Sequence, residues 1–156
     1  MTRRYGRARG GERARDQAPA GHWSTTTLLA AMGVGGPRAP LLFDGALDGE
    51  TFLAWIEQFL LRELKPGDVV VMDNLASHKG QSVRTLIEGA GARLLYLPAS
   101  SPDLNPIEKM WSKVKAHLRG AKARSEEALT TAVASALDAV TSDDVKGWFK
   151  SCGYTI

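Results

Sequence analysis

Two short apolar runs constrain the fold of this 156-residue chain more than any other feature. Val69-Val70-Val71-Met72 follows a helical pattern directly, and Leu94-Leu95-Tyr96-Leu97 follows a second one. Uninterrupted apolar runs between helices are typical of parallel strands that are buried on both faces. The chain is therefore predicted to be an α/β domain.

Periodicity and turn residues predict the remaining elements. We expect strands at 23–31, 40–44, 68–74 and 93–98, and helices at 48–64, 81–88, 105–120 and after the capping residues Ser125 and Ser142. The first two strands flank a turn rich in Gly and Pro, so they should pair antiparallel. This order of elements predicts a mixed sheet flanked by helices.

Composition excludes several classes of protein. The single cysteine, Cys152, rules out a disulfide framework and a multi-cysteine zinc site. The longest apolar runs fall far short of the roughly 20 residues that cross a bilayer. No apolar segment follows the arginine-rich N-terminus, so no signal peptide is expected. We predict a soluble, cytoplasmic protein without a membrane partner.

The charge is distributed unevenly. Residues 1–15 contain six arginines, among them Arg3, Arg4 and Arg7, and one glutamate, so this segment carries a formal charge of +5. The rest of the chain carries −2. A basic segment in front of a nearly neutral body favours a polyanionic partner, with nucleic acid as the first candidate. A solvated terminus without a partner explains the same pattern.

Two acidic residues lie at positions where functional side chains are expected. Asp73 follows the apolar run 69–72, and sites in open α/β sheets form beyond the carboxyl ends of strands. Glu108 lies three residues after Asn105, the predicted N-cap of a helix whose first residue is Pro106. Each has a structural alternative: Asp73 as a turn residue, and Glu108 as the second half of a capping box.

Taken together, two motifs resemble a known family. Residues 71–79, Val-Met-Asp-Asn-Leu-Ala-Ser-His-Lys, are followed by residues 101–111, Ser-Pro-Asp-Leu-Asn-Pro-Ile-Glu-Lys-Met-Trp. They resemble the DDE transposases of the mariner-like superfamily, on the side of the bacterial insertion sequences. Asp73 and Glu108 are separated by 34 residues, the spacing that this family uses between its second and third metal-binding carboxylates. The resemblance extends from about residue 3 to residue 154.

The resemblance implies an RNase H-like fold, a site for two Mg²⁺ or Mn²⁺ ions, and cleavage and joining of DNA at transposon ends and target. Asp73 and Glu108 would be the catalytic metal ligands, with Asp103 as a rival for the third carboxylate. Carboxylates suit this chemistry because Mg²⁺ prefers oxygen ligands and two such ions stabilise an in-line displacement at phosphorus.

Several polar side chains are weaker candidates for contacts with DNA. They are Arg3, Arg4, Arg7, His78, Lys79, Lys109 and Lys113. His78 would touch a phosphate or water, although a surface histidine is equally consistent with its position. Lys109 and Lys113 share a helix with Glu108 and would grip the DNA backbone, whereas a solvated helix face is the alternative.

The sequence also departs from the family. The first catalytic aspartate and its strand, the central one of the sheet, have no counterpart, because neither Asp16 nor Asp44 closes a buried apolar strand. The N-terminal helix-turn-helix region is absent as well. We therefore expect one partial domain over 1–156, with a basic segment at 1–21 and C-terminal helices at 121–156. The expected protein partners are an upstream-frame product or a second copy of the transposase.

Two other functions compete with an active transposase domain. One is a catalytically silent remnant that binds DNA or the intact transposase without cutting, and this fragment is expected to be inactive alone. The other is a phosphatase of the haloacid dehalogenase type with Asp73 as nucleophile. That chemistry needs a second aspartate two residues later, where this chain has Leu75, so we set it aside.

Overall fold

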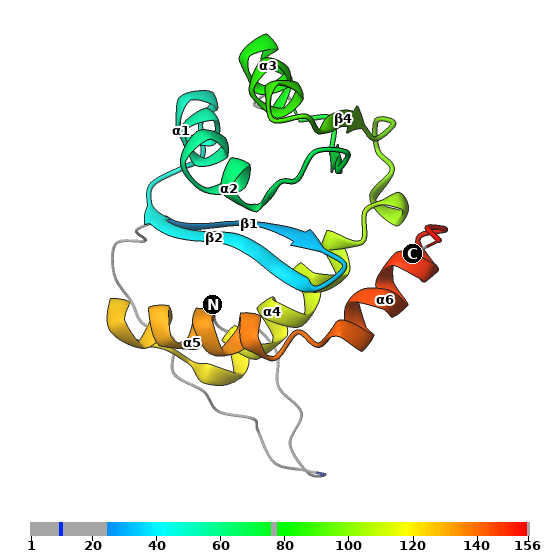
Figure 1. Cartoon of the computed structure of the whole chain (residues 1–156). Coiled ribbons are helices and arrows are strands. Elements are labelled where there is room, and N and C mark those ends of the chain that lie inside the picture. Colours follow the sequence, from blue (N-terminus) through cyan, green and yellow to red (C-terminus); the bar gives the residue numbers. More distant parts are fainter. Residues whose placement is uncertain (1–9, 11–24, 76–77, 156) are drawn as a thin grey trace.

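The computed structural model describes Gly10 and residues 25–75 and 78–155. Figure 1 shows the elements in their chain order. They are β1 (Thr26–Gly33), β2 (Gly36–Asp44), α1 (Gly49–Trp55), the π-helical turn η1 (Ile56–Leu60), α2 (Leu61–Glu63), β3 (Val69–Met72), α3 (Gln81–Gly89), β4 (Arg93–Tyr96), the 3-10 turn η3 (Pro102–Leu104), α4 (Ile107–Ala121), α5 (Glu126–Asp138) and α6 (Ser142–Ser151). Among the described residues, none of the helices has the length and hydropathy that a bilayer crossing requires.

The first two strands form an antiparallel hairpin, as the sequence predicted. Its register is irregular between Leu29 and Ala31, and on the facing strand Ala39 has a positive φ of 49°. The carbonyl oxygen of Ala39 accepts a hydrogen bond of 2.8 Å from the indole N–H of Trp55 on α1. The irregularity therefore gives a buried backbone acceptor a partner on the helix that covers the hairpin.

The segment α1–η1–α2 is one continuous helical stretch. It begins where the sequence predicted, because the carboxylate of Asp48 accepts a 2.8 Å hydrogen bond from the backbone N–H of Thr51. Its buried face includes Phe52, which is 4% exposed, and Ile56, which is fully buried. A π-helical turn inside the stretch was not foreseen, because the apolar spacing alone does not distinguish it from an α-helix.

Strands β3 and β4 pair in parallel, and helix α3 connects them along the chain. Alternate residues of the pair, such as Met72 and Leu94, pack into the core, whereas Val69, Val71 and Leu95 on the other face are exposed. The prediction of strands buried on both faces is therefore wrong for one face. Four consecutive apolar residues do not reveal which of two faces is covered.

The two strand pairs are not joined by hydrogen bonds within the described part of the chain. Both nevertheless contribute to one hydrophobic cluster around α1 and η1, with Leu29 and Leu41 from the hairpin and Val70 and Met72 from β3. The sequence predicted a mixed sheet that lacks its central strand. The described residues form an antiparallel pair and a parallel pair that share a core.

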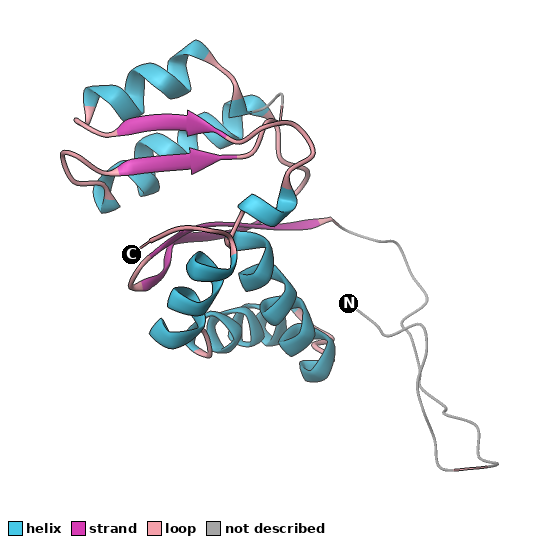
Figure 2. Ribbon diagram, turned by 90° about the vertical axis from the view of Figure 1, so that its right-hand side faces the viewer, coloured by secondary structure: helices cyan, strands magenta, loops and turns pink. Residues whose placement is uncertain are grey.

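The C-terminal helices cover the opposite face of the hairpin, so α1 and α2 lie on one side of it and α4 and α5 on the other (Figures 1 and 2). Met110 and Val114 of α4 and Val145 of α6 form a second cluster against Leu28 and Met32 of β1. Alternate residues of β1 thus serve two different cores. This alternation is what period-2 strand geometry requires.

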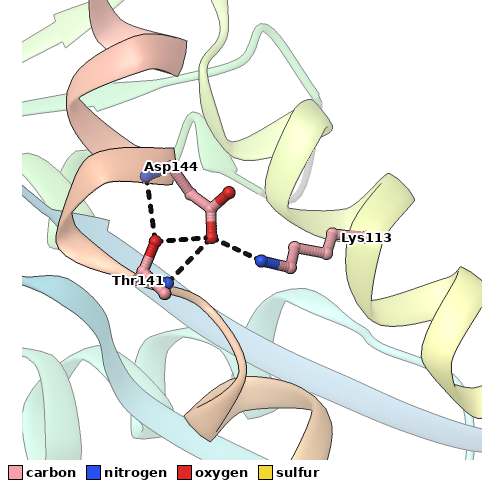
Figure 3. Close-up of polar contacts among 3 residues, drawn as sticks. All are labelled: Lys113, Thr141 and Asp144. Carbon is pink, nitrogen blue, oxygen red and sulfur yellow. Dashed lines mark hydrogen bonds and ion pairs between the residues drawn. The ribbon is translucent and has the colours of Figure 1, made fainter.

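Helix α6 is tied to α4 by one carboxylate, that of Asp144 (Figure 3). Thr141 caps α6 through a capping box: its hydroxyl accepts from the N–H of Asp144, and Asp144 accepts from the N–H of Thr141. The same carboxylate accepts a hydrogen bond from the ammonium of Lys113 on α4. The predicted cap at Ser142 is wrong by one residue, because only Thr141 has the extended backbone of an N-cap. Ser125 does cap α5, as expected.

The capping box and ion pair predict a pH dependence of stability. The hydrogen bond from Lys113 and those from Thr141 lower the pKa of Asp144 to about 2, below its ordinary value of 3.8. A lowered folded-state pKa contributes stability above the unfolded value, and this contribution is lost as pH falls from about 4 to about 2. Asp144→Asn should lower the melting temperature at pH 7, and its difference from the wild type should shrink towards pH 2.

Thermal unfolding followed by circular dichroism between pH 2 and 7 measures this effect. Asp143→Asn is the matched control, because Asp143 lies in the same first turn of α6 but makes none of these contacts. A melting-temperature difference for Asp144→Asn that stays constant down to pH 2 would contradict the prediction.

Candidate functional site

Asp73 lies directly beyond the carboxyl end of β3. The N–H of Leu97 donates a 2.8 Å hydrogen bond to the carbonyl of Met72, so the pairing of β3 and β4 continues to this edge. The loop that follows β4 therefore starts beside Asp73. This is the edge at which open α/β folds bring functional side chains together.

Glu108 lies in the first turn of α4. Asn105 has an extended backbone and Pro106 a helical one, as expected for a helix start, although no side chain caps this end. The predicted capping role of Asn105 is therefore not observed. The carboxylate of Glu108 is exposed and makes no hydrogen bond or ion pair with the described residues, so the capping-box alternative has no support.

The start of α4 is held from two directions. The buried Met110 anchors its first turn in the second cluster. The hydroxyl of Tyr154, beyond the end of α6, donates a 2.8 Å hydrogen bond to the carbonyl of Leu104 in η3. Burial raises the pKa of the Tyr154 hydroxyl above its ordinary value. Glu108 thus projects from a fixed helix end rather than from a loose loop.

Asp73 and Glu108 line the same pocket, of about 350 Å³. Its wall consists of residues 73–75, 97–102, Asn105 and Glu108. Ser100 in this wall has a positive φ of 56°, which is uncommon for a residue with a side chain and occurs often at functional sites. Asp103 is exposed on η3 and is not among the described residues that form the wall.

His78 contacts Asp73 directly. Its Nδ1 lies 2.6 Å from Oδ1 of Asp73, and its ring stacks on Phe52 with 4.1 Å between the ring centres. The hydroxyl of Tyr96 donates a 2.6 Å hydrogen bond to the backbone carbonyl of His78. The sequence predicted His78 as a contact for phosphate or water or as a surface histidine, and Tyr96 as part of a buried strand. The five-residue interval from Asp73 to His78 was the available signal, but a loop interval does not fix a contact.

The candidate cations differ in their surroundings. The ammonium of Lys113 pairs with the carboxylate of Asp144, whereas Lys79 and Lys109 are exposed and are not among the described residues that line the pocket. Arg3, Arg4 and Arg7 lie outside the described residues. The structure thus places three lysines but leaves the basic N-terminal segment as a prediction from sequence.

The donor set fits a hard divalent cation. Two carboxylates at one pocket supply the oxygen ligands that Mg²⁺ and Mn²⁺ prefer, with room for water and a phosphate. No group of three or more His, Cys, Asp or Glu side chains is close enough to bind a metal among residues 25–75 and 78–155. Asp44, at the end of β2, is not among the described residues that line the pocket, and its carboxylate accepts a 3.1 Å hydrogen bond from the hydroxyl of Thr26.

Comparison with solved structures identifies the fold. The Mos1 strand transfer complex superposes with a TM-score of 0.75 at 19% identity, covering 97% of this chain and 47% of that chain. The catalytic domain of the Mos1 mariner transposase gives a TM-score of 0.66 at 16% identity, over 83% of this chain and 75% of that domain. These similarities confirm the expected RNase H-like α/β fold.

Curated relatives are similar over shorter stretches. The Tc1 transposase of Caenorhabditis elegans is 32% identical over 77 residues, which are 49% of this chain and 28% of the relative. The Tcb2 transposase of Caenorhabditis briggsae is 38% identical over 55 residues, which are 35% of this chain and 20% of the relative. The chain thus spans less than a third of either relative. The family model described as DDE superfamily endonuclease matches residues 1–130, and the chain belongs to this family.

Proposed function

We propose that the chain is a transposase catalytic domain that performs metal-dependent phosphoryl transfer on DNA, cleaving and joining strands at transposon ends. The observation that carries the proposal is the convergence of Asp73 and Glu108 on one pocket, from a strand end and a helix start. We further propose that the domain belongs to a bacterial insertion sequence and that it is located in the cytoplasm.

Asp73 and Glu108 would hold two Mg²⁺ or Mn²⁺ ions jointly with water and the scissile phosphate. Two such ions stabilise the attacking and the leaving oxygen of an in-line displacement. The pocket of about 350 Å³ is large enough for hydrated ions and a phosphate group. Solved relatives support the metal: the Mos1 catalytic domain has been described with Mg and with Mn.

DNA is the proposed partner. The related Mos1 structures include a strand transfer complex and a paired-end complex with Mn. In this chain, Lys79 and Lys109 are exposed, Lys109 follows the pocket residue Glu108 in the sequence, and six arginines lie within residues 1–15. Such cations contribute affinity for the phosphate backbone that does not depend on sequence. Lys113 is a weaker candidate, because its ammonium already pairs with Asp144.

We also propose that the site needs a third carboxylate from another polypeptide segment. The described residues offer two carboxylates at the pocket, and their two strand pairs are not joined by hydrogen bonds. An upstream-frame product that adds the central strand, or a second copy of the transposase, would provide it. The second candidate function, a silent remnant that binds DNA without cutting, rests on the same observation.

The metal site predicts selective loss of metal binding. Asp73→Asn and Glu108→Gln should each weaken Mn²⁺ binding at least about tenfold, because each removes an anionic oxygen ligand. Electron paramagnetic resonance of free Mn²⁺ in titrations of the protein measures the affinity. Asp103→Asn is the matched control, with unchanged affinity expected. Weaker binding in Asp103→Asn together with wild-type binding in Glu108→Gln would assign the third carboxylate to Asp103 instead.

The basic segment predicts a salt effect. Each phosphate neutralised adds about −0.9 to the slope of log K against log salt concentration. Deletion of residues 1–15 should therefore flatten the slope for duplex DNA by up to about 5, if all six arginines bind phosphate. Fluorescence anisotropy between 50 and 300 mM NaCl measures the slope. Replacement of the six arginines by lysine should preserve the slope. An unchanged slope after deletion of residues 1–15 would show that this segment does not bind DNA.

The two-carboxylate site predicts that this chain alone does not cut DNA. Plasmid nicking with Mg²⁺ or Mn²⁺ should not exceed that of Asp73→Asn, because two carboxylates position the ions less securely than three. A version extended upstream by a segment with a strand-terminating aspartate should cut, and Asp73→Asn should abolish that activity. Cleavage by the short chain that depends on Asp73 would show that no further carboxylate is required.

A further inference from the structure

We propose that His78 is a positioning residue for Asp73: its Nδ1–H fixes the carboxylate so that one oxygen stays available to the metal. This inference rests on the proposed role of Asp73 as a metal ligand. It adds a residue that acts through Asp73 and does not itself bind the ion. Neutral imidazole is a poor ligand for Mg²⁺, which agrees with a supporting role.

Both hydrogen bonds that the described residues donate to the carboxylate of Asp73 go to the same oxygen, Oδ1. Nδ1 of His78 lies 2.6 Å from Oδ1, and the backbone N–H of Leu75 donates to the same oxygen at 3.4 Å. A carboxylate only accepts hydrogen bonds, so Nδ1 must carry the proton. Within the described part of the chain, no group donates to Oδ2. Oδ1 therefore accepts hydrogen bonds from the protein, whereas Oδ2 is available to an external ligand such as a metal ion.

His78 is itself held in place by two other elements. Its ring stacks on Phe52 of α1 with an interplanar angle of 25°, and Phe52 is only 4% exposed in the first cluster. Its backbone carbonyl accepts from the hydroxyl of Tyr96 at the end of β4. The imidazole side chain is 14% exposed, against 39% for Asp73. His78 is thus partly buried and contacted by two elements, whereas the carboxylate of Asp73 is more exposed and lines the pocket.

This arrangement is what preorganisation of a metal ligand requires. Carboxylates that bind metals are commonly oriented by hydrogen bonds from neighbouring groups, and removal of such a partner typically costs 10–100-fold in metal affinity. A ligand free to rotate pays conformational entropy each time it binds. His78 restricts Asp73 before the metal arrives, with Phe52 and Tyr96 as its supports.

A pair of variants separates the hydrogen bond from the packing. His78→Phe keeps an aromatic ring on Phe52 but has no N–H, whereas His78→Asn keeps an N–H at the place of Nδ1 but has no ring. In Mn²⁺ titrations followed by electron paramagnetic resonance, His78→Phe should bind about 10–100-fold more weakly than the wild type. His78→Asn should recover most of this loss and bind within about threefold of the wild type. Circular dichroism and thermal unfolding verify that both variants are folded.

Two results of the Mn²⁺ titrations would overturn the proposal. Wild-type Mn²⁺ affinity in folded His78→Phe would show that the hydrogen bond is dispensable, and equally weak binding by both variants would show that the ring matters rather than the N–H. Asp73→Asn separates this failure from that of the metal site: if it binds Mn²⁺ as the wild type does, Asp73 is not a ligand at all. In metal-free protein, imidazole ¹⁵N shifts should place the proton of neutral His78 on Nδ1, and a proton on Nε2 would contradict the proposal independently of any metal.

Discussion

The packing of α1 and η1 against both strand pairs is the constraint on which the rest of the structure depends. No hydrogen bond joins β1–β2 to β3–β4 within the described residues, so the first hydrophobic cluster must hold the two pairs together. Phe52 has two roles there: it is buried in the cluster, and its ring supports His78 beside Asp73. The core and the candidate site are therefore coupled, and a change that loosens α1 also loosens the carboxylate.

The second carboxylate depends on the other face of the hairpin. Glu108 takes its position from α4, which is anchored through Met110 and Val114 in the second cluster and through Lys113 to Asp144 on α6. Leu28 and Met32 of β1 belong to this cluster, whereas Leu29 belongs to the first. The hairpin thus links the two halves of the site, because its two faces pack against the helices that orient Asp73 and Glu108.

Much of the fold could be predicted, since the signals are local. Asp48 and Ser125 cap their helices as expected, and Asp73 follows a strand as the apolar run indicated. The predictions failed where several local solutions are equally good. Thr141 and Ser142 are both suitable N-caps, and the choice of Thr141 depends on Asp144, which also binds Lys113 of α4. The exposed face of β3 was likewise missed, because a strand of valines suits a covered and an uncovered face equally.

The sequence by itself determined the family, the order of elements and the places of Asp73 and Glu108, because motifs, caps and periodicity are properties of neighbouring residues. Only the tertiary structure decided that both carboxylates line one pocket, that His78 holds Asp73, and that Lys113 is occupied by Asp144. The physical reason is distance along the chain. These contacts join side chains from elements that meet only after the two hydrophobic clusters have formed, and no local pattern specifies how such elements are placed relative to one another.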